Sequence, residues 1–240
     1  MAKKPLYKRI LLKLSGEALM GAGKFGIDQK ASKNIAAAVK EIHSMGVQIG
    51  IVVGGGNIFR GSQAEEFGFS RTPADHIGML ATTINGLILQ QSLASLGCES
   101  HVMSAFDTDS IIEKYNWQGA LDHLSRGAIV IFVGGTGNPY FTTDTAAALR
   151  ASEINAEVLL KATKVDGVYD KDPIRYPSAK KFAHLTYAEV LTKKLNVMDS
   201  TAIALCRENQ IPIHVFNLFK KGSLLSAVTD RKVGSLVTGD

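Results

Sequence analysis

Short apolar runs alternate with segments of helical periodicity along most of the chain. The apolar runs predict strands over 10–14, 47–53, 100–104, 128–133, 157–161 and 211–216, with a last edge strand at 234–238. The helical spacing predicts a helix after Asp28, helices over 72–96, 144–154, 186–193 and 198–209, helical pieces within 109–126 and an irregular stretch over 58–71. This alternation implies right-handed crossovers and a mostly parallel sheet. We therefore expect an α/β fold, a three-layer αβα sandwich, in a single domain over 1–240 with a possible seam between two lobes within 120–160.

Capping signals mark the starts of several predicted helices. Asp28 is expected to cap the first one. Thr72-Pro73-Ala74-Asp75 reads as a capping box with proline at the first helical position. Asp144 stands at the head of its predicted helix, after two threonines. Capping is therefore the ordinary interpretation of both Asp75 and Asp144.

Composition places the chain among folded globular proteins. Of its 240 residues, 45% are hydrophobic and 20% are charged, which argues against disorder. The 27 basic and 22 acidic side chains leave a net charge of 27 − 22 = +5. This surplus suits an anionic ligand but is too small and too scattered to indicate nucleic-acid binding. Two cysteines favour a reduced, cytoplasmic protein, and we expect neither a signal peptide nor a membrane-spanning segment.

Four predicted strands end in residues that suit phosphate binding. The turns are Lys13 to Gly16, Gly54 to Asn57, Gly134 to Asn138 and Lys161 to Lys164. Glycine lets backbone N–H groups approach an anion, although each such turn taken alone is most simply a tight turn. Three consecutive glycines cost conformational entropy and need a reason such as a close ligand. Since ligands of open parallel sheets bind beyond the carboxyl ends of the strands, we predict an extended polyanion or two phosphorylated ligands there.

Other familiar motifs do not fit the sequence. The segment Gly21–Gly26 matches G-x-G-x-x-G, but it does not directly follow its strand, and the expected acidic residue is missing. We interpret it as a flexible lid or an effector-contacting loop. A P-loop is absent, because Ala22 stands where that motif needs lysine. The sequence has no H-E-x-x-H, no zinc-type cysteine–histidine spacing, no G-x-S-x-G and no stacking platform around Trp117, which weakens the metalloprotein, hydrolase and RNA-binding hypotheses.

Four charged residues are candidates for the chemistry of this site. Lys13 interrupts an apolar strand, so it is either a snorkelling or edge lysine or a cation aimed at a transferring phosphoryl group. Besides capping, Asp144 is a candidate to orient Lys13 or to meet a magnesium-bound phosphate. Asp75 is a candidate acceptor for a sugar hydroxyl, and Arg60 is a candidate phosphate clamp.

Six segments together carry a resemblance that spans about 7–238. They are Lys8–Leu19, Val53–Gly61, Asp75–Thr82, Gly135–Asp144, Leu160–Tyr169 and Val197–Asp199. The chain resembles the bacterial uridylate (UMP) kinases, a branch of the amino-acid kinase superfamily. The segments from Gly135 and from Leu160 are specific to this branch, whereas Lys-Leu-Ser-Gly and the triple glycine are shared by amino-acid kinases generally.

The resemblance implies a reaction and its setting. ATP would give its γ-phosphoryl group to UMP, forming ADP and UDP in pyrimidine nucleotide biosynthesis, with Mg²⁺ accompanying ATP and no metal ligand in the protein. A lobe over about 1–160 would bind UMP, and the part over about 161–240 would bind ATP. The implied assembly is a cytoplasmic homohexamer, without a membrane or nucleic-acid partner.

The motifs also imply roles for individual residues. Lys13, Asp144 and Arg60 would be catalytic, with Lys13 stabilising the transferred group and Asp144 ordering Lys13. The residues implied to contact ATP are Lys13, Leu14, Ser15, Gly16, Gly56, Arg60, Thr163, Tyr169 and Asp172. The residues implied to contact UMP are Gly55, Asp75, Thr136, Gly137, Asn138, Pro139, Tyr140, Phe141, Thr142 and Thr143.

Regulation and two other functions stay open at this point. In this family GTP often activates and UTP often inhibits, and the implied effector loop consists of Gly21, Ala22, Gly23, Lys24, Phe25 and Gly26. The segment Leu89–Ala94 departs from relatives that place arginine and histidine there, which leaves the effector undetermined. The alternatives are another amino-acid kinase that acts on a carboxylate, carbamate or phosphonate, and a nucleotide-sensing regulator that binds DNA or a protein partner.

Overall fold

The computed structural model describes residues 4–108 and 110–239. Outside it lie residues 1–3 and 240, at the ends of the predicted domain, and Asp109, within the predicted helical pieces. The strands are β1 (Arg9–Leu14), β2 (Gln48–Val53), β3 (Ser100–Ser104), β4 (Glu113–Lys114), β5 (Ile129–Val133), β6 (Val158–Thr163), β7 (Val168–Tyr169), β8 (Lys181–Phe182), β9 (His184–Thr186), β10 (Ile213–Asn217) and β11 (Ser235–Thr238). The helices are the 3-10 helix η1 (Gly16–Leu19) and α1 (Gln29–His43), α2 (Gly61–Glu66), α3 (Arg71–Ala94), α4 (Trp117–Ser125), α5 (Thr143–Glu153), α6 (Tyr187–Thr192), α7 (Ser200–Glu208) and α8 (Ser223–Thr229).

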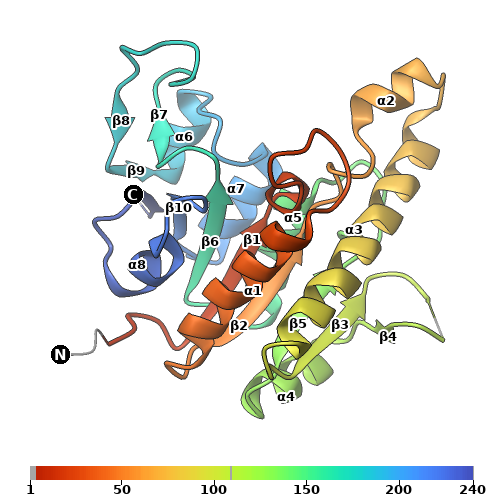
Figure 1. Ribbon diagram of the computed structural model, residues 1–240. Helices are drawn as coiled ribbons and strands as arrows, with labels where there is room; N and C mark the ends of the chain where they lie inside the picture. Colours follow the sequence, from red (N-terminus) through yellow and green to blue (C-terminus); the bar gives the residue numbers. More distant parts are fainter. Residues whose placement is uncertain (1–3, 109, 240) are drawn as a thin grey trace.

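One large sheet runs through the molecule (Figure 1). Within the described residues it has nine strands in the order β4-β3-β5-β2-β1-β6-β10-β11-β9, and β7 and β8 form a separate antiparallel pair. The pairs of the large sheet are parallel except for β10 with β11. The predicted α/β fold with a mostly parallel central sheet is therefore confirmed.

Helices cover both faces of the sheet, which gives the predicted three layers. Side chains alternate across a strand, so Leu12 and Leu14 of β1 pack in the cluster with α1, α3 and α8, while Leu11 packs in the cluster with α4, α5, α6 and α7. Because both faces are buried, the central strands read as continuous apolar runs rather than as alternating ones. Lys13 shares the face of Leu11 and therefore points toward the α5 layer.

The tail strand was predicted wrongly as an edge. β11 lies between β10 and β9, pairing antiparallel with β10 and parallel with β9. The strand that covers it, β9, has only three residues, too few to give a periodic signal. The predicted irregular stretch over 58–71 also contains the short helix α2.

The helix starts agree with the sequence only in part. Asp28 caps α1 as predicted, accepting a hydrogen bond from the N–H of Ala31 at 2.6 Å. The capping box predicted at Thr72 was wrong: the N-cap of α3 is Ser70, two residues earlier, which places Pro73 at the third helical position. For α5 the N-cap is Thr142, so Asp144 is the second helical residue and its carboxylate is free for other partners.

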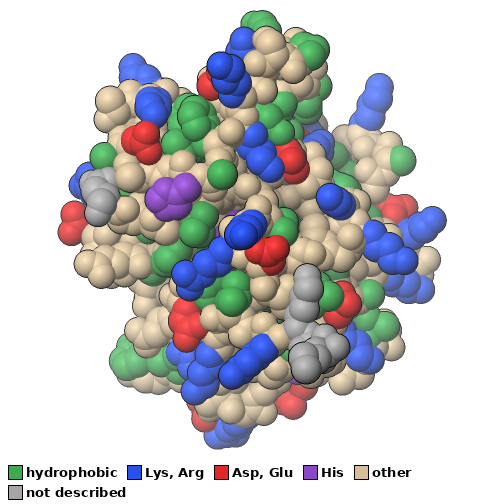
Figure 2. Space-filling model, turned by 90° about the vertical axis from the view of Figure 1, so that its left-hand side faces the viewer, with side chains coloured by type: hydrophobic (Ala, Val, Ile, Leu, Met, Phe, Trp, Pro, Cys, Tyr) green, Lys and Arg blue, Asp and Glu red, His purple; other side chains and the backbone are tan. Residues whose placement is uncertain are grey.

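The surface and the apolar segments of the described residues agree with what the composition predicts. On the face drawn in Figure 2, Lys and Arg side chains lie among Asp, Glu and apolar side chains. Cys98 and Cys206 are free and buried. Among the described residues, no helix combines the length and the apolar character needed to cross a membrane.

The contact between α3 and β5 depends on a glycine and allows a matched test. A Cβ on Gly86 would lie 2.4 Å from a methyl carbon of Val133, whereas a Cβ on Gly78 of the same helix meets nothing within 4 Å. We predict that Gly86→Ala lowers the unfolding free energy, since overpacking costs about 1–3 kcal/mol. Gly78→Ala should leave it unchanged or raise it by about 1 kcal/mol through helix propensity. Urea unfolding of both variants checks this, and equal effects would contradict the packing argument.

Candidate active site

Two lysines on neighbouring strands share one carboxylate at the carboxyl edge of the sheet. Lys13 of β1 and Lys161 of β6 stand opposite each other in the parallel register. The Lys13 ammonium lies 2.8 Å from Oδ1 of Asp144, and the Lys161 ammonium donates to Oδ2 at 2.7 Å. All three side chains are at most 15% exposed. These three groups together carry one net positive charge, which favours an anion at this edge.

Burial and charge act against each other in this cluster. Burial by itself would raise the pKa of Asp144, but the charges of Lys13 and Lys161 outweigh it and hold the pKa of the carboxyl below its ordinary value. Burial lowers the pKa of Lys161, and the neighbouring carboxylates Asp144 and Asp199 oppose this shift only in part. The carboxylate therefore stays ionised at neutral pH and fixes both ammonium groups.

A second carboxylate joins the start of α5 to the start of α7. Asp199 caps α7 through the N–H of Ala202 at 2.7 Å. It also accepts hydrogen bonds from the hydroxyls of Thr142 and Thr145, the latter at 2.9 and 3.0 Å. This clamp holds the first turn of α5, and with it Asp144, in place.

The glycine turns pack tightly against one another. A Cβ on Gly16 would lie 2.4 Å from Oδ1 of Asn57, and one on Gly55 would lie 2.7 Å from the carbonyl of Gly78. Those two glycines are therefore required by internal packing rather than by a ligand. A Cβ on Gly56 meets nothing within 4 Å, so internal packing does not require this glycine.

A buried pair of asparagines holds the glycine turn. The side-chain amides of Asn57 and Asn85 exchange hydrogen bonds of 3.0 and 2.7 Å, and Asn85 also donates to the carbonyl of Gly54. Asn57 donates in addition to the carbonyl of Gly26, at the end of the predicted effector loop. This network joins that loop, the triple-glycine turn and α3 into one unit.

Arg60 lies on the rim of the site, next to Lys164. Its Nε donates to the carbonyl of Gly56 at 2.9 Å, and its guanidinium pairs with Glu17 at 2.8 Å. Lys164 pairs with the other carboxylate oxygen at 2.6 Å, and its hydrogen bond is the main reason that the pKa of Glu17 lies below its ordinary value. Arg60 is therefore positioned at the glycine turn, where a phosphate clamp was predicted.

Asp75 ties α3 to the loop before α5. Its carboxylate accepts from Arg71 at 2.8 Å and from the N–H of Tyr140 at 2.7 Å, and Tyr140 has a positive φ of 72°. A pocket of about 690 Å³ opens beside these contacts. Of the predicted UMP residues, the pocket is lined by Gly55, Asp75, Phe141, Thr142 and Thr143. The lining also includes Gly56, Arg71, Gly135 and two phenylalanines, Phe59 and Phe69.

The remaining predicted UMP residues form the turn next to that pocket. Hydrogen bonds of 3.2 Å connect Thr136 Oγ1 with the carbonyl and the N–H of Asn138. Gly137 has a φ of 83°, and a Cβ there would lie 2.8 Å from the carbonyl of Ala105. Pro139 completes the segment before Tyr140, and none of the residues of this turn lines the pocket.

The predicted adenosine residues lie apart from this pocket. Thr163 ends β6, where its hydroxyl donates to the carbonyl of Val165 at 2.7 Å. Tyr169, on β7, donates to Asp166, and Asp172 accepts from the N–H of Ile174 at 2.9 Å in the turn that leads to β8. Leu14, Ser15 and Gly16 stand at the end of β1, between these residues and the glycine turns.

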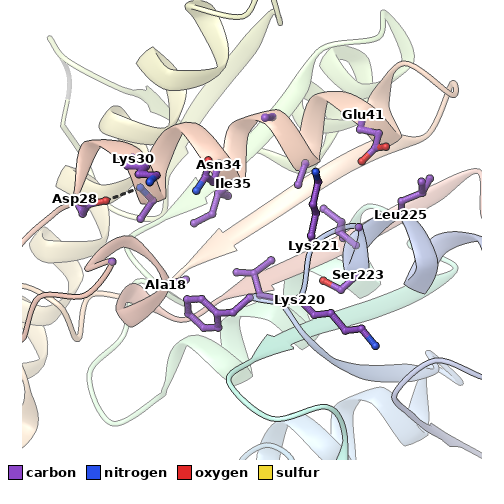
Figure 3. Close-up of a pocket in the computed structure, with 18 of the residues that line it drawn as sticks. Ala18, Asp28, Lys30, Asn34, Ile35, Glu41, Lys220, Lys221, Ser223 and Leu225 are labelled. Carbon is purple, nitrogen blue, oxygen red and sulfur yellow. Dashed lines mark hydrogen bonds between the residues drawn. The ribbon is translucent and has the colours of Figure 1, made fainter.

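A further pocket, of about 770 Å³, lies between α1 and the segment that leads into α8. Figure 3 shows Asn34, Ile35 and Glu41 of α1 facing the segment from Lys220 to Leu225. Two residues of the predicted effector loop, Gly21 and Ala22, belong to its lining, whereas Phe25 is exposed. The loop thus borders a cavity separate from the lysine–aspartate cluster.

Comparison with known proteins decides the family. The amino acid kinase family model matches residues 8–217. The chain belongs to the amino acid kinase family. It is therefore a kinase, an enzyme that transfers a phosphoryl group. A cationic cluster at the carboxyl edge of the sheet agrees with this chemistry, since Lys13 and Lys161 are at most 15% exposed there.

Individual members of the amino acid kinase family match nearly the whole chain. A uridylate kinase of Protochlamydia amoebophila is 56% identical over 232 residues, which cover 96% of this chain and 92% of the relative. A solved structure of a UMP kinase from Bacillus anthracis superposes with a TM-score of 0.94 at 41% identity, covering 98% of this chain and 97% of that one. A UMP kinase from Ureaplasma parvum gives 0.91 at 38% identity, covering 99% and 100%.

Two residues that hold the cluster around Asp144 were missed from the sequence. Lys161 was noticed only as part of a strand-end turn, although it interrupts an apolar strand as Lys13 does. Asp199 ends one of the six resembling segments but carries no signal of a role, because a helix cap looks the same in sequence whatever else it binds. The matching interruption of two strands was the signal available for Lys161.

Asp144 should make stability depend on acid pH. Asp144→Asn leaves two buried ammonium groups without their counter-ion, which we expect to cost about 3 kcal/mol of unfolding free energy at pH 7. Because the folded-state pKa lies below the unfolded value, the wild-type contribution is present above about pH 4 and is lost as the pH falls through the folded pKa. Urea unfolding from pH 7 to pH 3 should show a smaller acid loss in Asp144→Asn. The exposed Asp122→Asn is the control, and an unchanged acid slope in Asp144→Asn would contradict the assignment.

Proposed function

We propose that this kinase transfers the γ-phosphoryl group of ATP to UMP, giving ADP and UDP. The observation that carries the proposal is the pair of lysines that share Asp144 at the carboxyl edge of the sheet. Phosphoryl transfer demands positioning and charge neutralisation, which fixed ammonium groups supply. The names of the relatives, uridylate kinase and UMP kinase, support UMP as the acceptor.

The reaction places distinct demands on the cluster. A phosphate oxygen of UMP attacks the γ-phosphorus, the bond from that phosphorus to the bridging oxygen breaks, and ADP leaves. Lys13 and Lys161 neutralise charge on the transferring group and its neighbours, while Asp144 keeps both ammonium groups aimed. Since Asp144 is held by two lysines, we assign it positioning rather than proton abstraction.

The acceptor is proposed to occupy the 690 Å³ pocket. Thr142 and Thr143 line it and directly precede Asp144, so a phosphate there would lie toward the cluster. At the other side Asp75 offers a carboxylate to the ribose hydroxyls. The Thr136–Tyr140 turn would contribute backbone groups to the uracil. We therefore propose that UMP binds to the lobe over about 1–160.

ATP is proposed to lie along the end of β1 and toward the β7–β8 hairpin. Ser15, Gly16, Gly56 and Arg60 would meet its phosphates, and Thr163, Tyr169 and Asp172 would line the adenosine. Mg²⁺ enters bound to the phosphates of ATP and is part of that substrate. Asp144 and Asp199 already accept hydrogen bonds from lysines and threonines, so we assign neither as a dedicated metal ligand.

The setting of the enzyme completes the proposal. We place it in the cytoplasm, in pyrimidine nucleotide biosynthesis, as a homohexamer regulated by GTP, UTP or both. Leu80 and Ile84, one helical turn apart on α3, are 53% and 46% exposed, which supports a subunit contact there. The loop Gly21–Gly26 supports an effector response, because Asn57 connects it to the glycine turn.

The proposed reaction is tested directly with the purified enzyme. In a coupled assay of ADP release with Mg²⁺ and ATP, we expect it to form UDP from UMP and to use CMP or dCMP poorly.

Lys13 should matter more for turnover than for substrate binding. Lys13→Ala should lower kcat about 10²–10³-fold, because the lysine acts on charge that develops in the transition state. The exposed Lys33→Ala is the control. A loss of kcat/KM that comes entirely from a higher KM, with kcat unchanged, would contradict this role.

Asp75 should affect UMP selectively. Asp75→Asn keeps an oxygen for the N–H of Tyr140 but removes the charge offered to the ribose. We expect the KM for UMP to rise about tenfold, which corresponds to about 1.4 kcal/mol of lost binding, while the KM for ATP stays within twofold. Initial rates against each substrate check this, with Asp122→Asn as control. An equal rise for both substrates would count against the assignment of this pocket to UMP.

A further inference from the structure

Two histidines and a glutamate gather at the β4 edge of the sheet, away from the phosphoryl-transfer cluster. His101 comes from β3, Glu113 from β4 and His123 from α4. Each offers one ligand atom, and the three atoms lie within 4.8 Å of one another. In the sheet, β5 and β2 separate β3 from the strand that carries Lys13. The proposed reaction uses none of the three residues.

We propose that His101, Glu113 and His123 form a binding site for one divalent transition-metal ion, with Zn²⁺ as its representative. Two imidazoles and one carboxylate are a ligand set that suits Zn²⁺ and similar ions, whereas Mg²⁺ prefers oxygen ligands alone. The site therefore differs in its metal chemistry from the magnesium that enters with ATP.

The side chains are already grouped in a manner that a metal requires. The two imidazole rings stack with centroids 3.6 Å apart and an angle of 17° between their planes, and one nitrogen of each ring belongs to the three atoms within 4.8 Å of one another. Nε2 of His123 lies 3.0 Å from Oε2 of Glu113. Two ligands of a tetrahedral Zn²⁺ ion are about 3.4 Å apart, since each bond is about 2.0–2.2 Å long. On binding, a rotation about the side-chain torsions of one histidine would turn its ring out of the stack, so that both nitrogens point at the same ion.

The surroundings allow an ion to enter and complete its coordination. The side chains of His101 and His123 are 33% and 20% exposed. Nε2 of His101 lies 3.3 Å from Oε1 of Glu99, whose side chain is 74% exposed. This carboxylate is close enough to serve as a fourth ligand or to orient the imidazole ring. The ion would join β3, the two-residue strand β4 and α4 at the edge of the sheet.

Sequence spacing gave no sign of this site. The three ligands come from three separate elements, so they do not form any of the short spacings that metal motifs use. Parallel pairing of β3 with β4, which places Met103 opposite Glu113, and the packing of α4 bring them together. Only the folded chain therefore assembles the ligand set.

Calorimetric titration of the chelator-treated full chain with Zn²⁺ at neutral pH tests the proposal. We expect one equivalent to bind the wild type, and millimolar Mg²⁺ to leave that binding unchanged. His101→Ala and His123→Ala should each weaken it at least tenfold. His184→Ala is the matched control, because it removes another exposed histidine at the opposite end of the sheet, on β9. Titration with Co²⁺ should give the visible absorption of a four-coordinate ion.

The outcomes separate a metal site from simple histidine–glutamate ion pairs. Absence of zinc binding to the wild type, or zinc binding in both histidine variants as tight as in the wild type, would overturn the proposal and leave ion pairs only. Glu113→Gln keeps the size of the side chain and therefore tests whether lost binding comes from misfolding. It should weaken Zn²⁺ binding, while its melting temperature without metal stays near that of the wild type. UDP formation is measured separately, so failure of the metal site and failure of the proposed reaction are distinguishable.

Discussion

The sharing of Asp144 by Lys13 and Lys161 is the interaction on which the site depends. Each lysine interrupts an apolar strand between two covered faces, where an unpaired ammonium group would be costly. One carboxylate on α5 offsets both charges at distances of 2.8 and 2.7 Å. The contact also fixes α5 over β1 and β6. In the proposed reaction, the ion pairs that hold the layers together also aim the two cations.

Around this cluster, tight backbone packing positions the rest of the edge. The turns at Gly16 and Gly55 leave no room for a side chain, and the asparagine pair Asn57–Asn85 holds the triple glycine against α3. Asp199 holds the start of α5 through the hydroxyls of Thr142 and Thr145. The edge is thus preorganised on rigid elements, which is how enzymes obtain electrostatic stabilisation without reorganising their groups during the reaction. The histidine cluster on β3, β4 and α4 stands outside this system.

Much of the fold was predictable because burial leaves a periodic signal. The central strands β1, β2, β5 and β6 were found within one or two residues, since strands covered on both faces are continuously apolar. Elements of two or three residues, such as β4 and β9, were missed, and their absence made β11 look like an edge. The start of α3 was misplaced because Thr72 and Asp75 resemble a capping box, while the Asp75 carboxylate accepts from Arg71 and from Tyr140, far along the chain.

The sequence by itself determined the α/β class, the glycine turns at one edge, Lys13 as an exceptional strand residue, and the resemblance to a kinase family. These properties are local, or belong to motifs contiguous in the chain. The tertiary structure alone decided which groups meet: Lys161 lies opposite Lys13, both pair with Asp144, Asp199 accepts a hydrogen bond from Thr142, and two histidines lie beside Glu113. Such contacts depend on strand register and helix packing, which join residues from distant parts of the chain and leave no fixed spacing in the sequence.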